Sequence, residues 1–438
     1  MKGALDMSSI LTNTGAMTAL QTLKMVNRSL TDTQGMISTG KRVATAKDNS
    51  AVWAISKAME SDVAGFKRIS DSLSLGQATI DVARKGAETV TALLTQVKEK
   101  VVASQEENVD RNKIQTDIDA LRDQIAAVVG ASQFNGQYLL ENTEQTANSG
   151  GINVLASIDR SSDGTVASTD IRVNKQDLGT GASSIGASLT SLTGANNDIA
   201  GDGDAAAFVM TGAATAPTGT TTFGSASTDS VAAGTAFSIS ITGTAGNGLA
   251  ATTDRNDISY VARDGDTMAD VVAGLAQSFN SYAADDLGTD TTVNAVVQNG
   301  NEIAFTGHDG TGDNFSLTVN QYDPDASTTI GGRLSALADV DVTTQSGTDS
   351  ALAAIDGLID IAIDSAAAFG SAQMRIETQS NFVSGLTDAL KSGIGTLVDA
   401  DMEETSARLQ ALQVQQQLSI QAMSIANQAP QSLLSLFR

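Results

Sequence analysis

The chain has 438 residues, enough for about three domains of average size, and its 50 acidic and 26 basic residues give a formal net charge of −24. It contains no cysteine and a single histidine, which excludes disulfides, cysteine nucleophiles and cysteine-ligated or histidine-rich metal sites. The negative charge repels phosphate backbones, so we expect no nucleic acid partner. The composition favours a protein that is not an enzyme and that holds no cofactor or metal.

We expect neither a cleavable leader nor a membrane span. The first residues lack the unbroken apolar core of a cleavable secretory signal peptide. Nowhere do about 18 apolar residues follow one another, so we expect no contact with a membrane.

Charge and glycine divide the chain into three blocks. Residues 1–140 carry a net charge of +1, residues 141–349 a net charge of −20, and residues 350–438 a net charge of −5. The middle block also holds 26 of the 40 glycines. Two helix-compatible ends therefore flank a middle block whose composition is typical of turns and short strands.

The N-terminal block carries a long heptad pattern. Alternating steps of four and three residues select ten positions that are all apolar or glycine, which predicts a coiled coil. These positions are Ile69, Leu73, Gly76, Ile80, Ala83, Ala87, Val90, Leu94, Val97 and Val101. Shorter runs occur at Ile114, Ile118, Leu121, Ile125 and Val128, and at Phe369, Ile376, Val383, Leu390 and Leu397.

Weaker apolar stripes lie at the two extremities. They consist of Leu20, Leu23, Leu30 and Ile37, with Asn27 and Gln34 in the same seam, and of Leu409, Leu412, Val414, Leu418 and Ile425. A helix with one apolar stripe is stable only when the stripe is covered, so we expect the two ends of the chain to pair. A self-contained helical bundle is the alternative. The polar seam positions instead favour partners on other copies of the chain.

The middle block alternates apolar and polar residues with the period of β-strands. The alternation is clearest in residues 237–242, 293–297 and 315–319. Between them, residues 267–282 place their apolar side chains on one helical face, and Thr267 and Asp270 form a capping-box pattern. These patterns predict a folded β-rich unit with one helix, whereas residues 180–230 show no clear core.

Two polar groups of the middle block were candidates for chemistry. His308 lies in the segment TGHDGT without a nucleophile or second base nearby, so we expect a turn histidine. The acidic residues Asp198, Asp202 and Asp204 offer oxygen ligands for calcium. Because the closing glutamate of a twelve-residue calcium loop is missing, a solvated acidic turn is favoured.

Several segments resemble bacterial flagellins. They are ISTGKRVATAKDNSA at 37–51, QFNG at 133–136, VDADMEET at 398–405, ANQAPQ at 426–431 and LLSLFR at 433–438. The resemblance covers residues 7–178 and 350–438, with the motifs in the family's order at both termini. Residues 235–320 are similar, more weakly, to an insert of some flagellins and hook-type proteins.

The resemblance implies an α+β fold in which both termini form a long helical coiled-coil bundle and the middle forms an inserted β-rich outer domain. The implied segments are an inner coiled coil from residues 1–45 and 399–438, a helical core with β-hairpins from 46–178 and 350–398, and a variable outer domain at 179–349. The implied function is that of a structural subunit, exported unfolded by the flagellar type III system, that polymerises into the extracellular filament used for swimming.

The resemblance also implies partners: further copies of the chain, sibling flagellins, the filament cap, hook–filament junction proteins and an export chaperone. Two alternatives are a hook–filament junction protein and a calcium-dependent surface adhesin built on the acidic middle block. A protease insert is excluded, because no HExxH motif occurs and one histidine cannot form a two-histidine zinc site.

A second implied contact lies in residues 94–103, which correspond to the family segment sensed by the vertebrate innate receptor for flagellin. The corresponding residues here are Leu94, Gln96 and Glu99. Recognised flagellins carry an arginine at the position of Gln96. We therefore expect weak receptor activation, because a bidentate hydrogen-bond donor is missing.

Overall fold

The computed structural model describes residues 13–160, 165–187, 206–246, 248–287 and 292–436. The chain divides into two compact units, one of residues 1–70 with 381–438 and one of residues 71–380. Two long helices, α2 (Ser50–Ala103) and α5 (Gln345–Val398), contribute residues to both units. The expected α+β class is confirmed. Within the described ranges, none of the helices has both the length and the hydrophobicity needed to cross a membrane.

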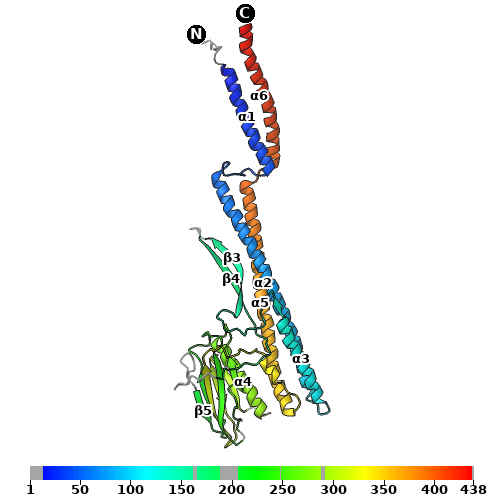
Figure 1. Cartoon of the computed structure of the whole chain (residues 1–438), viewed down its shortest axis with the longest axis vertical. Coiled ribbons are helices and arrows are strands. Elements are labelled where there is room, and N and C mark those ends of the chain that lie inside the picture. Colours follow the sequence, from blue (N-terminus) through cyan, green and yellow to red (C-terminus); the bar gives the residue numbers. More distant parts are fainter. Residues whose placement is uncertain (1–12, 161–164, 188–205, 247, 288–291, 437–438) are drawn as a thin grey trace. The chain divides into compact units, whose positions relative to one another are not determined.

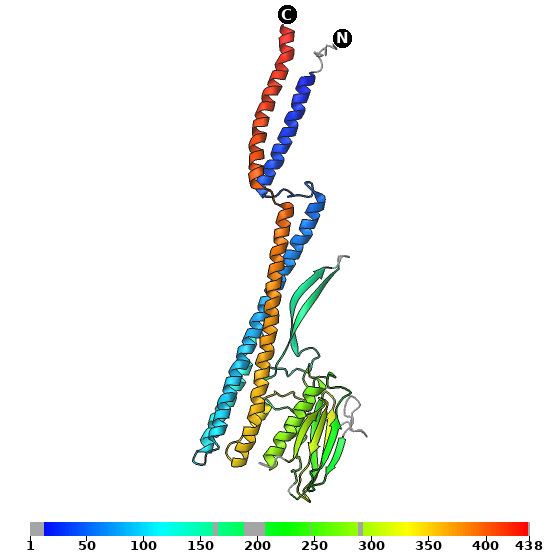
Figure 2. The ribbon, with the colours of Figure 1, turned by 180° about the vertical axis from the view of Figure 1, so that it is seen from behind.

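The first unit pairs the two ends of the chain, as predicted. Helices α1 (Thr14–Thr39) and α6 (Met402–Leu436) lie side by side (Figures 1 and 2). Asn13 caps α1, and its side-chain oxygen accepts a hydrogen bond from the amide of Ala16 (3.0 Å). Gly40 ends the helix with a φ of +70°, which glycine adopts without steric cost.

The segment after α1 is hydrogen-bonded to the segment before α6. The amide of Arg42 donates to the carbonyl of Val398 (2.6 Å), and the amide of Ala400 donates to the carbonyl of Gly40 (3.0 Å). The guanidinium of Arg42 donates to the carbonyl of Leu397 (2.9 Å). The two connecting segments therefore form one hydrogen-bonded joint.

The predicted coiled-coil positions lie within α2. Nine of the ten carry side chains that are at most 1% exposed: Ile69, Leu73, Ile80, Ala83, Ala87, Val90, Leu94, Val97 and Val101. Polar contacts join α2 to its neighbours. Arg84 Nε donates to Gln373 Oε1 of α5 (2.9 Å), and Lys100 Nζ donates to Asp117 Oδ2 of α3 (Arg111–Ala131; 2.5 Å). These three helices form the stem of the second unit.

The tenth coiled-coil position, Gly76, admits a β-hairpin. Strands β3 (Gly151–Arg160) and β4 (Val166–Asn174) pair antiparallel, and Val154 of β3 lies over Gly76. A Cβ at position 76 would stand 2.7 Å from both methyl carbons of Val154. The missing side chain therefore lets the hairpin approach α2 closely.

The QFNG segment forms a tight hairpin turn. Strands β1 (Gln133–Phe134) and β2 (Gln137–Tyr138) pair on either side of Asn135 and Gly136, whose φ angles are +51° and +77°. Asparagine followed by glycine is the pair that this mirror-image turn prefers.

The β-rich part contains two antiparallel sheets. One has the order β6 (Thr218–Thr222), β10 (Glu302–Thr306), β9 (Asn294–Gln298), and the other has the order β5 (Ala206–Met210), β11 (Asn314–Tyr322), β7 (Ala236–Ala245), β8 (Ser259–Val261). The predicted alternation at 237–242, 293–297 and 315–319 falls on β7, β9 and β11, so these strands are confirmed. The weakly patterned residues 180–230 contain β5 and β6.

Helix α4 (Met268–Leu287) covers the core of these sheets, as its predicted apolar face requires (Figure 1). The buried members of that face include Val271, Val272, Leu275 and Phe279. One half of the predicted capping box is present, because the carboxylate of Asp270 accepts hydrogen bonds from the amide (2.9 Å) and the hydroxyl (2.7 Å) of Thr267, while the amide of Asp270 donates to the carbonyl of Thr267 (3.0 Å). The short 3-10 helix η1 (Ser335–Ala338) follows β11.

A neck connects the β-rich part to the stem. The neck consists of the segment around residues 179–181, through which the chain enters the β-rich part, and the segment around residues 332–334, through which it leaves. The two segments lie side by side, because the amide of Gly332 donates to the carbonyl of Gly181 (2.8 Å) and the amide of Leu334 donates to the carbonyl of Gly179 (3.0 Å). A fully buried ion pair lies beside this crossing, with Arg263 Nε 2.6 Å from Asp177 Oδ2 and the two side chains 4% and 1% exposed.

Arg263 has further polar partners in the neck. Its guanidinium donates to the carbonyl of Gly331 (2.5 Å) and to the hydroxyl of Tyr260 (2.9 Å), whose proton is donated to Asp266 (2.7 Å). Burial raises the pKa of Asp266 and of the Tyr260 hydroxyl above their ordinary values. Removal of either partner would leave an unpaired charge in the protein interior, which is strongly destabilising.

Candidate assembly surfaces

The contact between α1 and α6 follows a regular heptad on both helices. The shielded positions recur at steps of three and four residues. They are Ala16, Ala19, Leu23, Val26, Leu30, Thr33 and Ile37 on α1, and Thr405, Leu409, Leu412, Gln416, Ser419, Met423 and Ala426 on α6. The predicted seam residues Leu23, Leu30, Ile37, Leu409 and Leu412 are among them.

The predicted seam was wrong at two positions of α1. Asn27 and Gln34 are exposed, and the contact passes instead through their neighbours Val26 and Thr33. Asn27 lies at the edge, where its side-chain oxygen accepts a hydrogen bond from Gln416 Nε2 (2.8 Å). The observed contact face differs from the predicted one because small residues such as Ala19 and Thr33 belong to it. Such residues do not stand out in a hydrophobic pattern.

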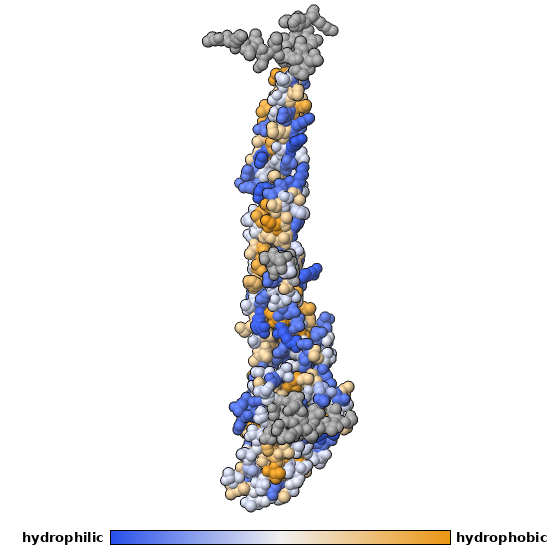
Figure 3. Space-filling view, turned by 90° about the vertical axis from the view of Figure 1, so that its left-hand side faces the viewer, coloured by the Kyte–Doolittle hydropathy of each residue, from blue (hydrophilic) through white to orange (hydrophobic). Residues whose placement is uncertain are grey.

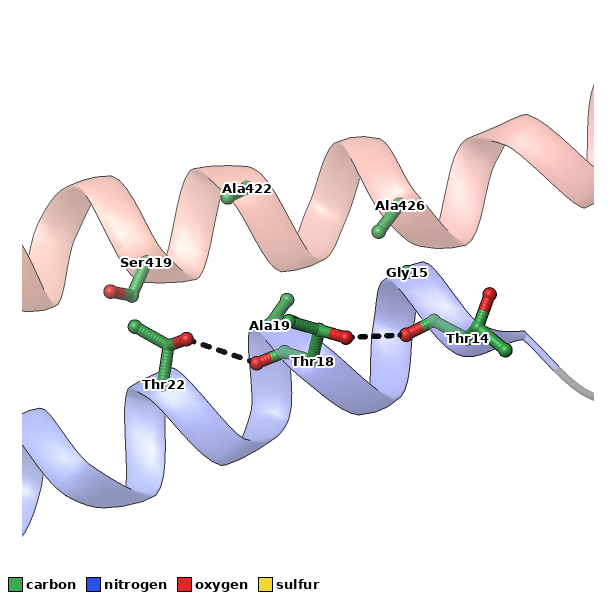
Figure 4. A pocket seen from close by; sticks show the side chains of 8 residues that line it. All are labelled: Thr14, Gly15, Thr18, Ala19, Thr22, Ser419, Ala422 and Ala426. Carbon is green, nitrogen blue, oxygen red and sulfur yellow. Dashed lines mark hydrogen bonds between the residues drawn. The ribbon is translucent and has the colours of Figure 1, made fainter.

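Small side chains leave the α1–α6 contact incompletely filled. A groove of about 520 Å³ lies between Thr14, Gly15, Thr18, Ala19 and Thr22 on one side and Ser419, Ala422 and Ala426 on the other (Figure 4). The hydroxyls of Thr18 and Thr22 donate to carbonyls of their own helix one turn earlier (2.9 and 3.0 Å), so they do not bridge the groove. The pair therefore buries little apolar surface for its length.

Large apolar side chains of the same two helices remain exposed to solvent. Eight of them keep between 43% and 68% of their surface exposed: Met17, Leu20 and Met25 on α1, and Met402, Val414, Leu418, Ile420 and Ile425 on α6. Hydrophobic patches on the terminal helices are visible in the space-filling view (Figure 3). We call these eight residues the exposed apolar stripes. Three predicted seam residues, Leu20, Leu418 and Ile425, belong to them and are not covered by α1 or α6.

The stripe on α6 has a defined direction. Val414, Leu418 and Ile425 are spaced by four and seven residues, so they share one face of the helix. Leu418 also borders a second groove, of about 510 Å³, together with Met25 and Leu412. Clusters of exposed apolar side chains mark surfaces that contact a partner.

The receptor-equivalent segment is part of α2. Leu94 is fully buried in the heptad core, whereas Gln96 and Glu99 are exposed. Between them, Lys98 pairs with Asp356 of α5 (2.5 Å). Of the three predicted residues, only Gln96 and Glu99 are therefore placed to contact another protein.

The two candidate chemical groups of the middle block have different outcomes. His308 follows β10, and its Nδ1 accepts a hydrogen bond from the amide of Gly310 (2.8 Å), which is the geometry of a turn histidine. Asp198, Asp202 and Asp204 lie outside the described residues. Across the part of the chain that the structure describes, no three His, Cys, Asp or Glu side chains converge as metal ligands would.

Comparison with known proteins identifies relatives over the whole chain. A model of the bacterial flagellin N-terminal helical region matches residues 10–146, and a model of the bacterial flagellin C-terminal helical region matches residues 352–437. Flagellin A and Flagellin B of Rhizobium meliloti are each 36% identical over 99% of this chain and 100% of their own length. Flagellin D of Rhizobium meliloti strain 1021 is 32% identical over the same shares.

Among solved structures, the chain is similar to the Xanthomonas campestris protein FlgL. The two are 13% identical over 77% of this chain and 99% of that chain, with a TM-score of 0.33. A likeness at that score carries no argument about function.

Proposed function

Because this chain belongs to the bacterial flagellin family and is a structural subunit of the flagellar filament, we propose that neighbouring subunits bind one another through the exposed apolar stripes of α1 and α6. The observation that carries this proposal is the presence of eight large apolar side chains on the outside of a helix pair that covers itself poorly. Covering them with further copies of the pair gains the hydrophobic free energy that the single chain leaves unused.

The loose α1–α6 contact supports a particular order of events. We propose that the chain is exported unfolded through the flagellar type III system and that its termini fold fully only at the growing end of the filament. Helices with a thin apolar face are marginal alone and gain stability from tertiary packing. The extracellular filament is then the place where α1 and α6 complete their core.

The proposed partners are those that a subunit of the extracellular filament meets during export and assembly. They are further copies of the chain, sibling flagellins, the filament cap, hook–filament junction proteins and an export chaperone. The several flagellins of Rhizobium meliloti among the relatives support co-assembly of siblings. We propose that the subunit performs no catalysis and contributes only packing and stiffness.

We propose the same five segments that the resemblance implies, with boundaries at 45/46, 178/179, 349/350 and 398/399. The boundary at 45/46 falls between α1, which ends at Thr39, and α2, which begins at Ser50. The boundary at 398/399 falls between α5, which ends at Val398, and α6, which begins at Met402. The hydrogen bond from the amide of Leu334 to the carbonyl of Gly179 in the neck supports the boundary at 178/179.

A substitution in the α6 stripe tests the proposal. We expect Leu418→Asp to abolish polymerisation at concentrations at which the unchanged chain forms filaments, because a carboxylate would be buried without a partner between subunits. Leu418 is 58% exposed in the single chain, so the subunit should keep its helix content. Electron microscopy and sedimentation measure filaments, and circular dichroism measures the helices.

The matched control is Gln417→Asp, which adds the same charge to the exposed residue before Leu418, about 100° away from it around α6. It should polymerise. Filaments from Leu418→Asp in the amount given by the unchanged chain would remove the stripe from the assembly surface.

We also propose that the subunit activates the vertebrate innate receptor for flagellin weakly. Gln96 is exposed on α2 but has no guanidinium to form a bidentate contact. In a reporter-cell titration, Gln96→Arg should activate at lower concentration than the unchanged chain. Equal potency of the unchanged chain and a strongly activating flagellin would refute the proposal.

A further inference from the structure

Two of the exposed methionines lie in the apolar stripe of α1. Among the described methionines, Met17, Met25, Met374 and Met402 keep between 44% and 70% of their surface exposed. Met210 and Met268, by contrast, are buried in the core of the β-rich part. Access to oxidants in solution therefore differs strongly along the chain.

Met25 also faces the partner helix across a groove. It lines the groove of about 510 Å³ that Val26, Leu412 and Leu418 border. Met17 lies one turn from Leu20 on the same side of α1, whereas Met25 points about 80° away from Met17, toward the groove. A neighbouring subunit that covers Leu20 therefore approaches Met17, and one that covers Leu418 across the groove approaches Met25.

We infer that Met17 and Met25 are oxidation sites through which hydroperoxides block the addition of a free subunit to the filament. The inference rests on the proposed function of the exposed apolar stripes. Each thioether sulfur attacks one oxygen of hydrogen peroxide, the O–O bond breaks, and the proton of the attacked oxygen passes to the departing hydroxide. The products are a methionine sulfoxide and water, so the sulfur loses the two electrons that the peroxide gains.

The oxidised side chain is tolerated in the free subunit and not in the filament. A sulfoxide is polar, and in the free subunit both side chains are in contact with water. In the filament the neighbouring subunit would cover the S=O dipole without supplying a hydrogen bond, which is unfavourable. We expect each sulfoxide to raise the critical concentration for polymerisation about tenfold.

The experiment uses the full-length subunit and hydrogen peroxide. The dose is set so that Met210 and Met268 stay unmodified, and mass spectrometry measures the sulfoxide at each methionine. Sedimentation then gives the critical concentration of treated and untreated samples. The variants are a double substitution, Met17→Leu with Met25→Leu, and a control, Met374→Leu, and each is compared with its own untreated sample.

The treated unchanged chain and the treated Met374→Leu control should both show a critical concentration raised about a hundredfold. The double variant, which still carries the exposed Met402 of α6, should show a treated-to-untreated ratio at least tenfold lower than that of the unchanged chain. Methionine sulfoxide reductases with dithiothreitol should restore polymerisation of the unchanged chain.

Two results would overturn the inference. One is an unchanged critical concentration of the chain that carries both sulfoxides, and the other is an equal loss in the double variant. Failure of the untreated chain to polymerise would contradict the proposed function itself, and this outcome differs from a loss seen only after oxidation.

Discussion

Removal of residues 399–438 should leave a soluble protein that forms no filaments. The deletion removes α6, and with it the partner of the heptad face of α1 and most of the exposed apolar stripes. Val26 and Thr33 would then lose the contacts that shield them, and an unsupported amphipathic helix of this length is marginal in water. Sedimentation and electron microscopy of the truncated chain, at concentrations at which the full chain polymerises, measure the effect.

A deletion in the β-rich part is the matched comparison. Gly181 and Gly332 are hydrogen-bonded neighbours in the neck, so residues 182–331 can be replaced by a two-residue Asn-Gly turn. This variant loses more residues than the first but keeps α1 and α6, and it should still form filaments. Assembled filaments from the chain lacking residues 399–438 would contradict the account.

Replacement of Arg263 should have the largest effect on the stability of the β-rich part. Arg263→Met leaves the carboxylate of Asp177 buried without its cation, and the removal of one partner of a buried pair costs about 3–5 kcal/mol. For a unit of this size we expect the melting temperature to fall by roughly 10 °C. Calorimetry of the full-length chain measures this.

The pH dependence gives the effect a second signature. Without Arg263, burial should raise the pKa of Asp266 further above its ordinary value. A carboxyl whose pKa is raised in the folded state stabilises that state when protonated, so stability is lost as the pH rises through the raised pKa. The difference between Arg263→Met and the unchanged chain should therefore shrink as the pH falls from neutrality toward the ordinary aspartate pKa of about 4.

Arg333→Met is the control for this prediction. Arg333 pairs with Asp270 (3.4 Å) but is one-third exposed, so its loss should cost much less. If Arg263→Met melted at the temperature of the unchanged chain, the ion pair would not be holding the neck.

The long helices and the sheets of the β-rich part could be predicted because their patterns are strong and local. The heptad that ends at Val101 is apolar throughout, and period-two alternation marks β7 and β11. The start of α4 follows from two residues, Thr267 and Asp270, whose spacing alone defines the cap.

The neck could not be predicted in this way. Asp177 and Arg263 are 86 residues apart, and no periodic pattern relates them. A lone Asp or Arg in a polar segment is exposed more often than buried, so the sequence offers no signal for this ion pair.

The assembly surface was predictable only in part. Leu23 and Leu412 line the α1–α6 contact and stand out in the sequence, because leucines dominate the hydrophobic pattern. Ala19, Thr33 and Ser419 were missed, because small and hydroxylated side chains signal neither burial nor exposure. Large apolar residues such as Leu418 and Ile425 remain exposed, because the α1–α6 helix pair does not cover them.

Hydrogen exchange of the free subunit and of the assembled filament, read by mass spectrometry, tests the central claim most directly. The account predicts that the amides of α1 and α6 exchange rapidly in the dilute subunit and become strongly protected in the filament, while α2 between residues 71 and 103 is protected in both. Slow exchange of both terminal helices in the dilute subunit, equal to that in the filament, would show that the helix pair is complete by itself and would contradict the account.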